Sequence, residues 1–293
     1  MAQIFGLLNV NKPSGPTSHD LVAAVRRGAH VKKVGHAGTL DPLATGVLVL
    51  CLGPATRLSE YAMRSRKIYR ARVHFGVATD TYDAQGEVTA RSEALPERAA
   101  VEAALAGFRG EIAQVPPMYS AIKRGGRKLY ELARAGQQVE RPPRAVSVYR
   151  LDLLNWQPPF ATLEVECSPG TYIRSLAHDL GQALGCGAHL AALQRRASGR
   201  FHVDEAVPWD DLRAAMEAGD WQRYLLPPDL ALADVSALHL DAEQSARVLH
   251  GNMIPAAADV AGELVRAYDV EGRFVAVLER RGAQWKPQKV FVS

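Results

Sequence analysis

The chain has 293 residues, which is enough for one large domain or two smaller ones, with a hydrophobic core that needs no disulfide or metal. Apolar residues make up 47% and charged residues 23%, as in ordinary globular proteins. The longest aliphatic run near the front, residues 47–52, is far shorter than the roughly 20 residues that cross a bilayer. Three widely spaced cysteines, Cys51, Cys167 and Cys186, argue against a disulfide framework or a zinc ribbon. Membrane, secreted and disordered classes are disfavoured, and a cytosolic protein is expected.

Positive charge is concentrated at the front of the chain. Residues 1–75 contain eleven Lys or Arg and three Asp or Glu, although the whole chain has a net charge of only +4. Within this part, residues 64–72 contain five positive charges and no acid, and a second basic stretch comprises Lys123, Arg124, Arg127 and Lys128. Such clusters favour a polyanion partner, above all nucleic acid. The alternative is that these side chains solvate an exposed face.

The first half of the chain predicts alternating short strands and helices. Residues 5–10 are expected to form a strand that ends in the turn Asn-Lys-Pro-Ser-Gly-Pro, and Thr17 or Ser18 then caps a helix that runs to about residue 27. Strands are predicted at residues 31–34 and 47–52 and a helix at residues 55–63. Residues 67–75 alternate cleanly, which places Tyr69 on the apolar face of a strand despite the surrounding basic residues.

The second half predicts a helix at residues 96–108, paired strands at residues 147–156 and 160–167, and an amphipathic helix at residues 172–184. Residues 225–230 are typical of a linker, and the tail suggests strands at residues 264–270, 273–279 and 290–292. Because helices and antiparallel strands are mixed without regular β-α-β alternation, the expected class is α+β.

The glycine-rich loop at residues 35–46 is the densest candidate for chemistry. A phosphate-binding loop would need Lys after its last glycine, where this chain has Val47, and no nucleophile elbow or paired-histidine zinc motif is present. What remains is one acid, Asp41. From the residues alone, an Asp that caps its own turn, with Pro42 after it, is the competing explanation.

Longer motifs carry a resemblance to a known family. The segment GTLDPLATGVL follows NKPSGPTS, and then come KIYRARVHFGVATDTYDAQG, PPMYSAIKRGGRKLYELARAG, CSPGTYIRSLAHDLGQALGCGAHL and LQRR. In this order they resemble the TruB family of tRNA pseudouridine synthases, over residues 5–200 and more weakly beyond. The resemblance implies a pseudouridine synthase-like catalytic domain with a mixed, mostly antiparallel sheet at residues 1–229. A small β-rich PUA-like RNA-binding domain would follow at residues 230–293. Asn11 departs from the family, which often has Asp there.

The activity implied by this resemblance is isomerisation of uridine 55 in the T-loop of tRNA to pseudouridine. The target base lies stacked in a folded loop, so it has to be flipped out, at a cost of a few kcal/mol. Asp41 would be the nucleophile, because a carboxylate is ionised at neutral pH and can form a covalent adduct that later leaves. Whether it attacks C1′ of the ribose or C6 of the base stays open.

The resemblance also implies roles for further residues. Arg174 would pair with Asp41 and keep it ionised, while Tyr69 would stack on the flipped uracil and help to remove the C5 proton. The pocket would be lined by Tyr172 and Leu193, with the Leu193 backbone reading the uracil edge. The other implied residues are His36, which would occupy the space that the base vacates, Asp83, which would bond near the base or hold its neighbours, and Lys12, a candidate substrate contact expected to support the catalytic loop.

No metal or organic cofactor is implied, and the partner is the T arm of tRNA, bound by a cytoplasmic monomer that requires no protein partner or membrane. The basic clusters would contact phosphates, which position RNA without reading its sequence. Two alternatives remain at this point. One is a tRNA-binding or tRNA-folding chaperone in which catalysis is secondary, and the other is the guide-RNA-dependent branch of the superfamily.

Overall fold

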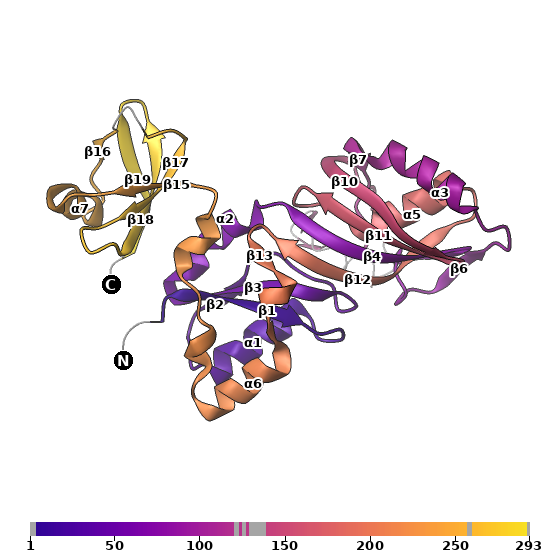
Figure 1. Cartoon of the computed structure of the whole chain (residues 1–293), viewed down its shortest axis with the longest axis horizontal. Coiled ribbons are helices and arrows are strands. Elements are labelled where there is room, and N and C mark those ends of the chain that lie inside the picture. The colour runs from indigo at the N-terminus through magenta and orange to yellow at the C-terminus, as the bar shows by residue number, and fades with distance from the viewer. Residues whose placement is uncertain (1–3, 120–122, 125–126, 129–138, 257–259, 292–293) are drawn as a thin grey trace.

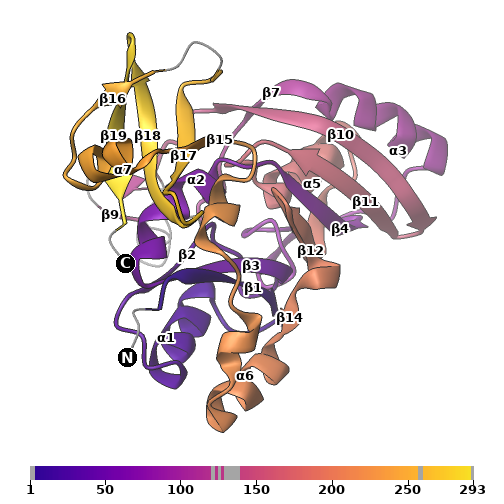
Figure 2. The same cartoon turned by 60° about the vertical axis from the view of Figure 1, so that its left-hand side comes forward.

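The computed structural model describes residues 4–119, 123–124, 127–128, 139–256 and 260–291. Figure 1 shows two parts: a long unit built around a large curved sheet, and a small β-rich unit formed by the C-terminal residues. Figure 2 shows the small unit close to α2 (Ser59–Met63), near the part of the large unit that holds the N-terminal strands. No helix in the described part of the chain combines the length and apolar character that a bilayer crossing requires.

The large sheet is mixed and mostly antiparallel. Within the described residues, the parallel pairs are β1 with β14 and β3 with β12, and the other neighbours run antiparallel. Across the sheet the strands are β14 (Val207–Pro208), β1 (Gly6–Lys12), β3 (Thr45–Leu52), β12 (Ala188–Ser198), β4 (Lys67–Phe75), β11 (Phe160–Cys167), β10 (Arg144–Gln157) and β7 (Gly110–Gln114), with β2 (Val34–His36) on β3 and β13 (Phe201–His202) on β12. The α+β class expected from the sequence is confirmed.

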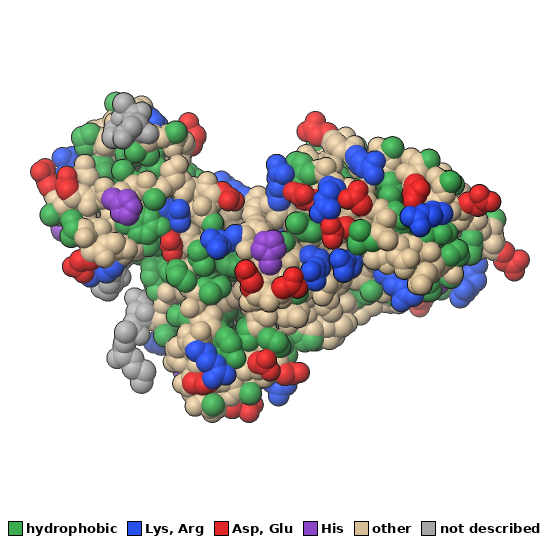
Figure 3. All heavy atoms as spheres, viewed as in Figure 1, with side chains coloured by type: hydrophobic (Ala, Val, Ile, Leu, Met, Phe, Trp, Pro, Cys, Tyr) green, Lys and Arg blue, Asp and Glu red, His purple; other side chains and the backbone are tan. Residues whose placement is uncertain are grey.

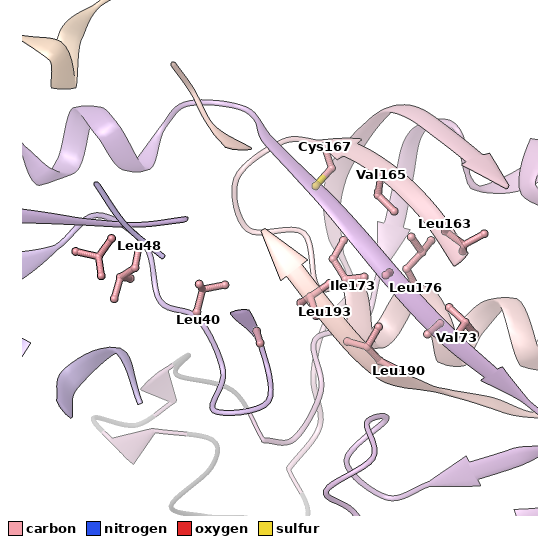
Figure 4. Packing of buried hydrophobic residues seen from close by; sticks show 14 of the residues in the cluster. Leu40, Leu48, Val73, Leu163, Val165, Cys167, Ile173, Leu176, Leu190 and Leu193 are labelled. Carbon is pink, nitrogen blue, oxygen red and sulfur yellow. The ribbon is translucent and has the colours of Figure 1, made fainter. Parts of the chain in front are cut away.

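One helix covers the central strands. Ile173 and Leu176 of α5 (Ile173–Ala183) face Val73 of β4 and Leu190 of β12 in Figure 4, and all four are at most 4% exposed. At ~25 cal/mol per Å² of apolar area, burial of such side chains contributes about 1.5–3 kcal/mol each, so the sheet and α5 form a firm platform. The N-terminal end of α5 lies beside the loop that contains Asp41, because Arg174 in its first turn contacts the Asp41 carboxylate.

The remaining helices cover other parts of the sheet. Of the two capping residues that the sequence offers, Thr17 caps α1, through a capping box with Asp20, and Ser18 is the first helical residue. Among the described residues, the helices of the large unit besides α2 and α5 are α1 (Ser18–Gly28), α3 (Arg98–Leu105) and α6 (Trp209–Ala218), with 3₁₀ turns η1 (Gly53–Leu58), η2 (Ala106–Phe108), η3 (Val203–Glu205), η4 (Trp221–Tyr224) and η5 (Pro228–Leu232). Two short hairpins pair β5 (Val77–Thr79) with β6 (Val88–Arg91) and β8 (Lys123–Arg124) with β9 (Arg127–Lys128).

Several element boundaries differ from the predictions. The strand expected at residues 31–34 is β2, which begins only at Val34 and ends at His36. The helix expected at residues 55–63 is divided: it begins as the 3₁₀ turn η1, with Pro54 in its first turn, and continues as α2 from Ser59. The segment expected as a linker at residues 225–230 is bonded to the body of the protein, since Leu226 exchanges backbone hydrogen bonds with Leu7.

The C-terminal unit is a sheet ordered β15 (Ser236–His239), β17 (Leu264–Tyr268), β18 (Phe274–Arg281), β19 (Gln284–Val290) and β16 (Ile254–Pro255), with helix α7 (Ala242–Leu249). The strand predicted at residues 290–292 shares only Val290 with β19, which begins six residues earlier, at Gln284, and residue 292 lies outside the described residues. The Lys and Pro residues of β19 interrupt the alternation of apolar and polar residues that indicates a strand, although Trp285 is fully buried. A β-rich C-terminal domain is nevertheless confirmed.

The basic run of residues 64–72 is not a continuous phosphate-binding surface. Lys67 is 5% exposed, and its ammonium donates to the carbonyls of Ala62, Met63 and Ser65 at the end of α2. Arg70 pairs with Glu164 across the antiparallel β4–β11 ladder, and Arg66 pairs with Glu166. The face in Figure 3 accordingly mixes acidic and basic side chains. The expectation that this cluster faces phosphates is therefore wrong for Lys67, which is buried. Arg66 and Arg70 are already paired with carboxylates of the protein.

A cluster of aromatic rings joins the two units. Phe5 stacks on Phe291 with ring centroids 4.9 Å apart and lies 6.4 Å from Phe274. Arg57 lies over the Phe291 ring and donates to the carbonyl of Val290 at 2.7 Å. Burial of these rings couples the C-terminal sheet to the N-terminal strand.

Replacement of Phe5 by Ala is expected to lower the free energy of unfolding by about 2 kcal/mol, less than the 3–5 kcal/mol typical of a fully buried Phe. Urea unfolding followed by tryptophan fluorescence measures this change. Val270→Ala is the control, because Val270 is 66% exposed and its truncation should change stability by less than about 0.5 kcal/mol. An equal effect of the two substitutions would show that the ring cluster does not stabilise the junction.

Candidate active site

Asp41 lies in the loop between β2 and β3, and the backbone carbonyls of this loop are bound by donors from other elements. Ser18 at the start of α1 both donates to the Leu40 carbonyl and accepts from the Leu40 N–H, at 3.0 and 2.8 Å. The remaining donors to the loop are Lys12 Nζ to Pro42 and Ala44, the Gly15 N–H to Pro42, Ser14 Oγ to Leu43, and Arg195 to Gly38 and Thr39. The backbone on both sides of Asp41 is therefore fixed.

Two buried cations, Lys12 and Arg195, supply four of these hydrogen bonds. Lys12 has no exposed surface, and its three hydrogen bonds, to Pro13, Pro42 and Ala44, use its full donor capacity. Burial lowers the pKa of Lys12 to about 8, opposed by the nearby Asp41 carboxylate. Lys12 therefore supports the loop through its enclosed ammonium group. Arg195 of β12 is 1% exposed and donates to Gly38, Thr39 and Val47.

Gly46 permits the close contact between the end of this loop and β12. Its φ of +96° is a conformation that residues with a Cβ rarely adopt. A Cβ at this position would lie 2.3 Å from the Arg195 carbonyl oxygen and 2.9 Å from its nitrogen. Only glycine therefore allows β3 to pair with β12 at the position where Arg195 reaches back to the loop.

Arg174 joins two carboxylates. It lies in the first turn of α5 and is 6% exposed, and its Nε lies 3.0 Å from Asp41 Oδ2 while Nη1 lies 3.1 Å from Asp83 Oδ2. Nη2 donates to the carbonyl of Tyr119 at 2.8 Å. Asp83 is itself 3% exposed and accepts from Thr81 Oγ1 and the Gln85 N–H. The planar guanidinium thus uses separate nitrogens for separate partners, which a lysine cannot reproduce.

Asp41 is surrounded by protein atoms but remains accessible, with 37% of its side chain exposed. Desolvation raises the pKa of Asp41 above its ordinary value of 3.8, and the second carboxylate, Asp83, raises it further. Arg174 is the strongest opposing influence, followed by Lys12 and Arg195. An accessible carboxylate held by one guanidinium, with its remaining surface open, has the geometry of a nucleophile or a base.

Tyr69 lies on β4 directly opposite Arg195 in the β4–β12 ladder and packs against the hydrophobic core. Burial raises the pKa of Tyr69, opposed by the Arg195 guanidinium, so its hydroxyl is protonated at neutral pH. Leu193 is 8% exposed and faces Ala71 in the same ladder, and its carbonyl accepts from Thr45 Oγ1 at 3.3 Å. Tyr172 is the N-cap residue of α5, two positions before Arg174.

His36 ends β2 and is half-buried, and its Nδ1 atom is shielded from solvent and has no hydrogen-bond partner among the described residues. Its ring lies 5.5 Å from that of His19 in an edge-on arrangement. Burial lowers the pKa of His36, and the neighbouring His19 lowers it further, so the imidazole is neutral at neutral pH. A neutral ring is suited to contact with nucleobases.

The structure brings Asp41, Arg174 and Asp83 into one ion-paired group. Tyr69 lies opposite Arg195 in the β4–β12 ladder, and Arg195 and Lys12 both bind backbone carbonyls of the loop that contains Asp41. Reasoning from the residues missed Arg195 and Ser18 as supports of this loop, although Arg195 stood within the matched LQRR segment. The described residues contain no cluster of three or more His, Cys, Asp and Glu side chains that could hold a metal ion. The side chains of the basic stretch Lys123, Arg124, Arg127 and Lys128 lie outside the described part.

Models of one protein family match nearly the whole chain. The N-terminal domain of TruB family pseudouridylate synthases matches residues 26–173, and the C-terminal domain of tRNA pseudouridylate synthase B matches residues 174–233. A third model, the C-terminal region of tRNA pseudouridine synthase II, matches residues 236–292. The predicted boundary at residue 230 lies close to this last match and remains a prediction.

Relatives named tRNA pseudouridine synthase B are similar to the chain over most of its length. The protein from Dehalococcoides mccartyi strain BAV1 is 45% identical over 98% of this chain and 96% of its own. That from Symbiobacterium thermophilum is 51% identical over 85% of this chain and 83% of its own, and that from Haemophilus influenzae is 43% identical over 94% and 90%.

Solved structures give the same result for the fold. A Cbf5–Nop10–Gar1 complex contains a chain with a TM-score of 0.77 and 28% identity, covering 98% of this chain and 85% of that one. A chain in an H/ACA RNP bound to a substrate RNA containing 2′-deoxyuridine gives 0.76 and 26%, covering 99% and 86%. From the matched models and the relatives' identities, the chain belongs to the TruB family of pseudouridylate synthases and is an enzyme that forms pseudouridine in tRNA.

Proposed function

We propose that the enzyme converts uridine 55 in the T-loop of tRNA to pseudouridine and that Asp41 is its nucleophile. The observation that carries the second part is the Asp41–Arg174 pair, in which a 37% exposed carboxylate is held at 3.0 Å by a buried guanidinium. The choice of uridine rests on the resemblance of the 35–46 loop and the later motifs to the family.

The chemistry requires an ionised carboxylate beside a base that has left its stack. Asp41 adds to the nucleoside, at C1′ or at C6, and the N1–C1′ bond breaks. The uracil turns, C5 bonds to C1′, the carboxylate leaves, and the C5 proton is lost while N1 gains one. Arg174 keeps Asp41 ionised before attack and as it departs, because the guanidinium stabilises the negative charge at both stages.

Neighbouring residues take supporting roles in this proposal. The ring of Tyr69 forms a wall against which uracil stacks, with Tyr172 and Leu193 beside it. Because the Tyr69 hydroxyl is protonated at neutral pH, removal of the C5 proton by this residue would first require its own ionisation. The neutral ring of His36 occupies the position that the flipped base leaves. Asp83 holds Arg174 through the 3.1 Å ion pair rather than contacting the base.

The enzyme is proposed to act on tRNA as a monomer, with no protein partner and no guide RNA. Support comes from relatives at 43–51% identity that are named for tRNA, whereas the chains from the Cbf5–Nop10–Gar1 complex and the H/ACA RNP are 28% and 26% identical. Modification of an unmodified tRNA transcript by the purified chain tests this directly. A requirement for added RNA or protein would place the chain with the guide-dependent branch.

Tritium release from C5-labelled uridine in a T-arm hairpin tests the reaction itself. Wild type should release label, and Asp41→Asn should not, because the amide cannot act as the nucleophile. Mapping of the product should place pseudouridine at position 55. If Asp41→Asn releases label at a rate near wild type, Asp41 is not the nucleophile. If pseudouridine forms elsewhere in tRNA, the target site is wrong.

Arg174→Lys should bind tRNA with nearly normal affinity yet lose at least about 100-fold in kcat, because a point charge cannot contact Asp41, Asp83 and the Tyr119 carbonyl together. Single-turnover kinetics and a filter-binding Kd separate the two effects. Arg70→Lys is the matched control, since Arg70 pairs with Glu164 at an exposed position on β4. Normal turnover of Arg174→Lys would remove this residue from the catalytic group.

The rate should depend on pH through Asp41. Because the active form is the carboxylate, kcat/KM is expected to fall as pH decreases through the pKa of Asp41, which burial raises above 3.8. In Arg174→Gln the opposing positive charge is lost, so this acid limb should move to higher pH while the maximal rate falls. Arg196→Gln, which removes an arginine paired with Asp204 instead, should leave the limb in place. Identical acid limbs in wild type and Arg174→Gln would contradict the assignment.

A further inference from the structure

Two buried polar side chains each bind both backbone groups of one residue next to the reactive ion pair. The Ser18 hydroxyl donates to the Leu40 carbonyl and accepts from the Leu40 N–H. The Gln114 side chain does the same with Tyr172, donating from Nε2 to the carbonyl at 2.9 Å and accepting at Oε1 from the N–H at 2.7 Å. Ser18 is 1% exposed and Gln114 2% exposed. We call Ser18 and Gln114 the backbone clamps.

The two residues that they bind flank the two partners of the ion pair. Leu40 directly precedes Asp41, and Tyr172 lies two positions before Arg174. Leu40 belongs to a loop, and the Tyr172 side chain makes no cap bond to α5. Leu40 lies outside any strand or helix, whereas the Tyr172 carbonyl also accepts the first hydrogen bond of α5, from the Leu176 N–H at 3.1 Å. The clamps bind the backbone groups of Leu40 and Tyr172 from residues 22 and 58 positions away.

Binding of both the N–H and the C=O of one residue fixes the peptide planes on its two sides, because each plane moves as a unit. Ser18 thereby sets the direction in which the Asp41 side chain leaves the loop. Gln114 sets the start of α5 and, through the first helical turn, the position of the Arg174 side chain. The clamps belong to separate elements, α1 and β7, so each partner of the ion pair is held by a different part of the scaffold.

We propose that Ser18 and Gln114 are positioning residues for pseudouridine formation, which set the distance and angle between the Asp41 carboxylate and the Arg174 guanidinium. Neither contacts the reacting atoms. The proposal rests on the roles of Asp41 and Arg174 given above. It predicts that loss of a clamp slows the chemical step without weakening tRNA binding, because the ion pair is displaced while the RNA-binding surface is unchanged.

Substitutions that conserve side-chain volume keep the fold while they weaken the clamps. Ser18→Cys replaces the hydroxyl by a weak donor and acceptor, and Gln114→Met keeps an unbranched side chain of similar size but removes the amide donor and acceptor. Ser92→Cys and Gln157→Met are the matched controls, because they make the same kinds of replacement away from the catalytic loop. Ser92 directly follows β6, and Gln157 is an exposed glutamine at the end of β10.

Single-turnover rates, the Kd for tRNA and the pH profile are measured on the full chain, with circular dichroism spectra confirming the fold of each variant. Each clamp variant should lose about 10-fold or more in rate with Kd within about twofold of wild type. The acid limb should move to higher pH, because a displaced Arg174 holds Asp41 in its ionised form less well. In the double clamp variant the two losses should combine less than multiplicatively, since both act on one ion pair.

The proposal is overturned if folded clamp variants turn over at the rate of the controls, or if their acid limb stays with that of wild type. It is equally overturned if the loss lies in Kd alone. Asp41→Asn measured in parallel separates this failure from failure of the proposed function. An inactive Asp41→Asn beside fully active clamp variants rejects only the positioning role, whereas an active Asp41→Asn rejects the nucleophile on which that role depends.

Discussion

One guanidinium between two carboxylates is the interaction on which the site depends. Asp41 and Asp83 lie on the two sides of Arg174, so the three side chains together carry one negative charge. Without the arginine, two like charges would share a poorly solvated space, and the pKa of Asp41, which burial and Asp83 already raise, would rise further. The bond from Arg174 to the Tyr119 carbonyl and the bonds that Asp83 accepts from its own turn keep this arrangement in one geometry.

The residues that shape the catalytic loop also govern its electrostatics. Lys12 and Arg195 are buried because they bind loop carbonyls, and both place positive charge near Asp41. Burial of Asp41 alone would favour its neutral form, and these two cations oppose that tendency together with Arg174. Support of the backbone and ionisation of the carboxylate are therefore two effects of the same side chains, and a change in either cation disturbs both.

Local sequence patterns could predict some of this structure but not all of it. The alternation of residues 67–75 coincides with β4, and the cap at Thr17 with the start of α1, because both signals lie within a few residues. The resemblance to the family supplied Asp41 and Arg174. Ser18, Gln114 and Arg195 were missed because their partners lie from 22 to 157 positions away, where no local period reveals them. The partner acids of the basic run are equally remote in sequence.

The hydrogen-bonded backbone carbonyls of residues 38–40 and 42–44 affect which partner, enzyme or RNA, changes conformation when the two bind. A loop with so many backbone partners has little freedom to advance toward the RNA. The base flipping that the proposed function requires then places the conformational change on the nucleic acid. Uridines differ in how easily the surrounding RNA unstacks and bends, so under this proposal a rigid loop favours uridines whose surroundings deform easily.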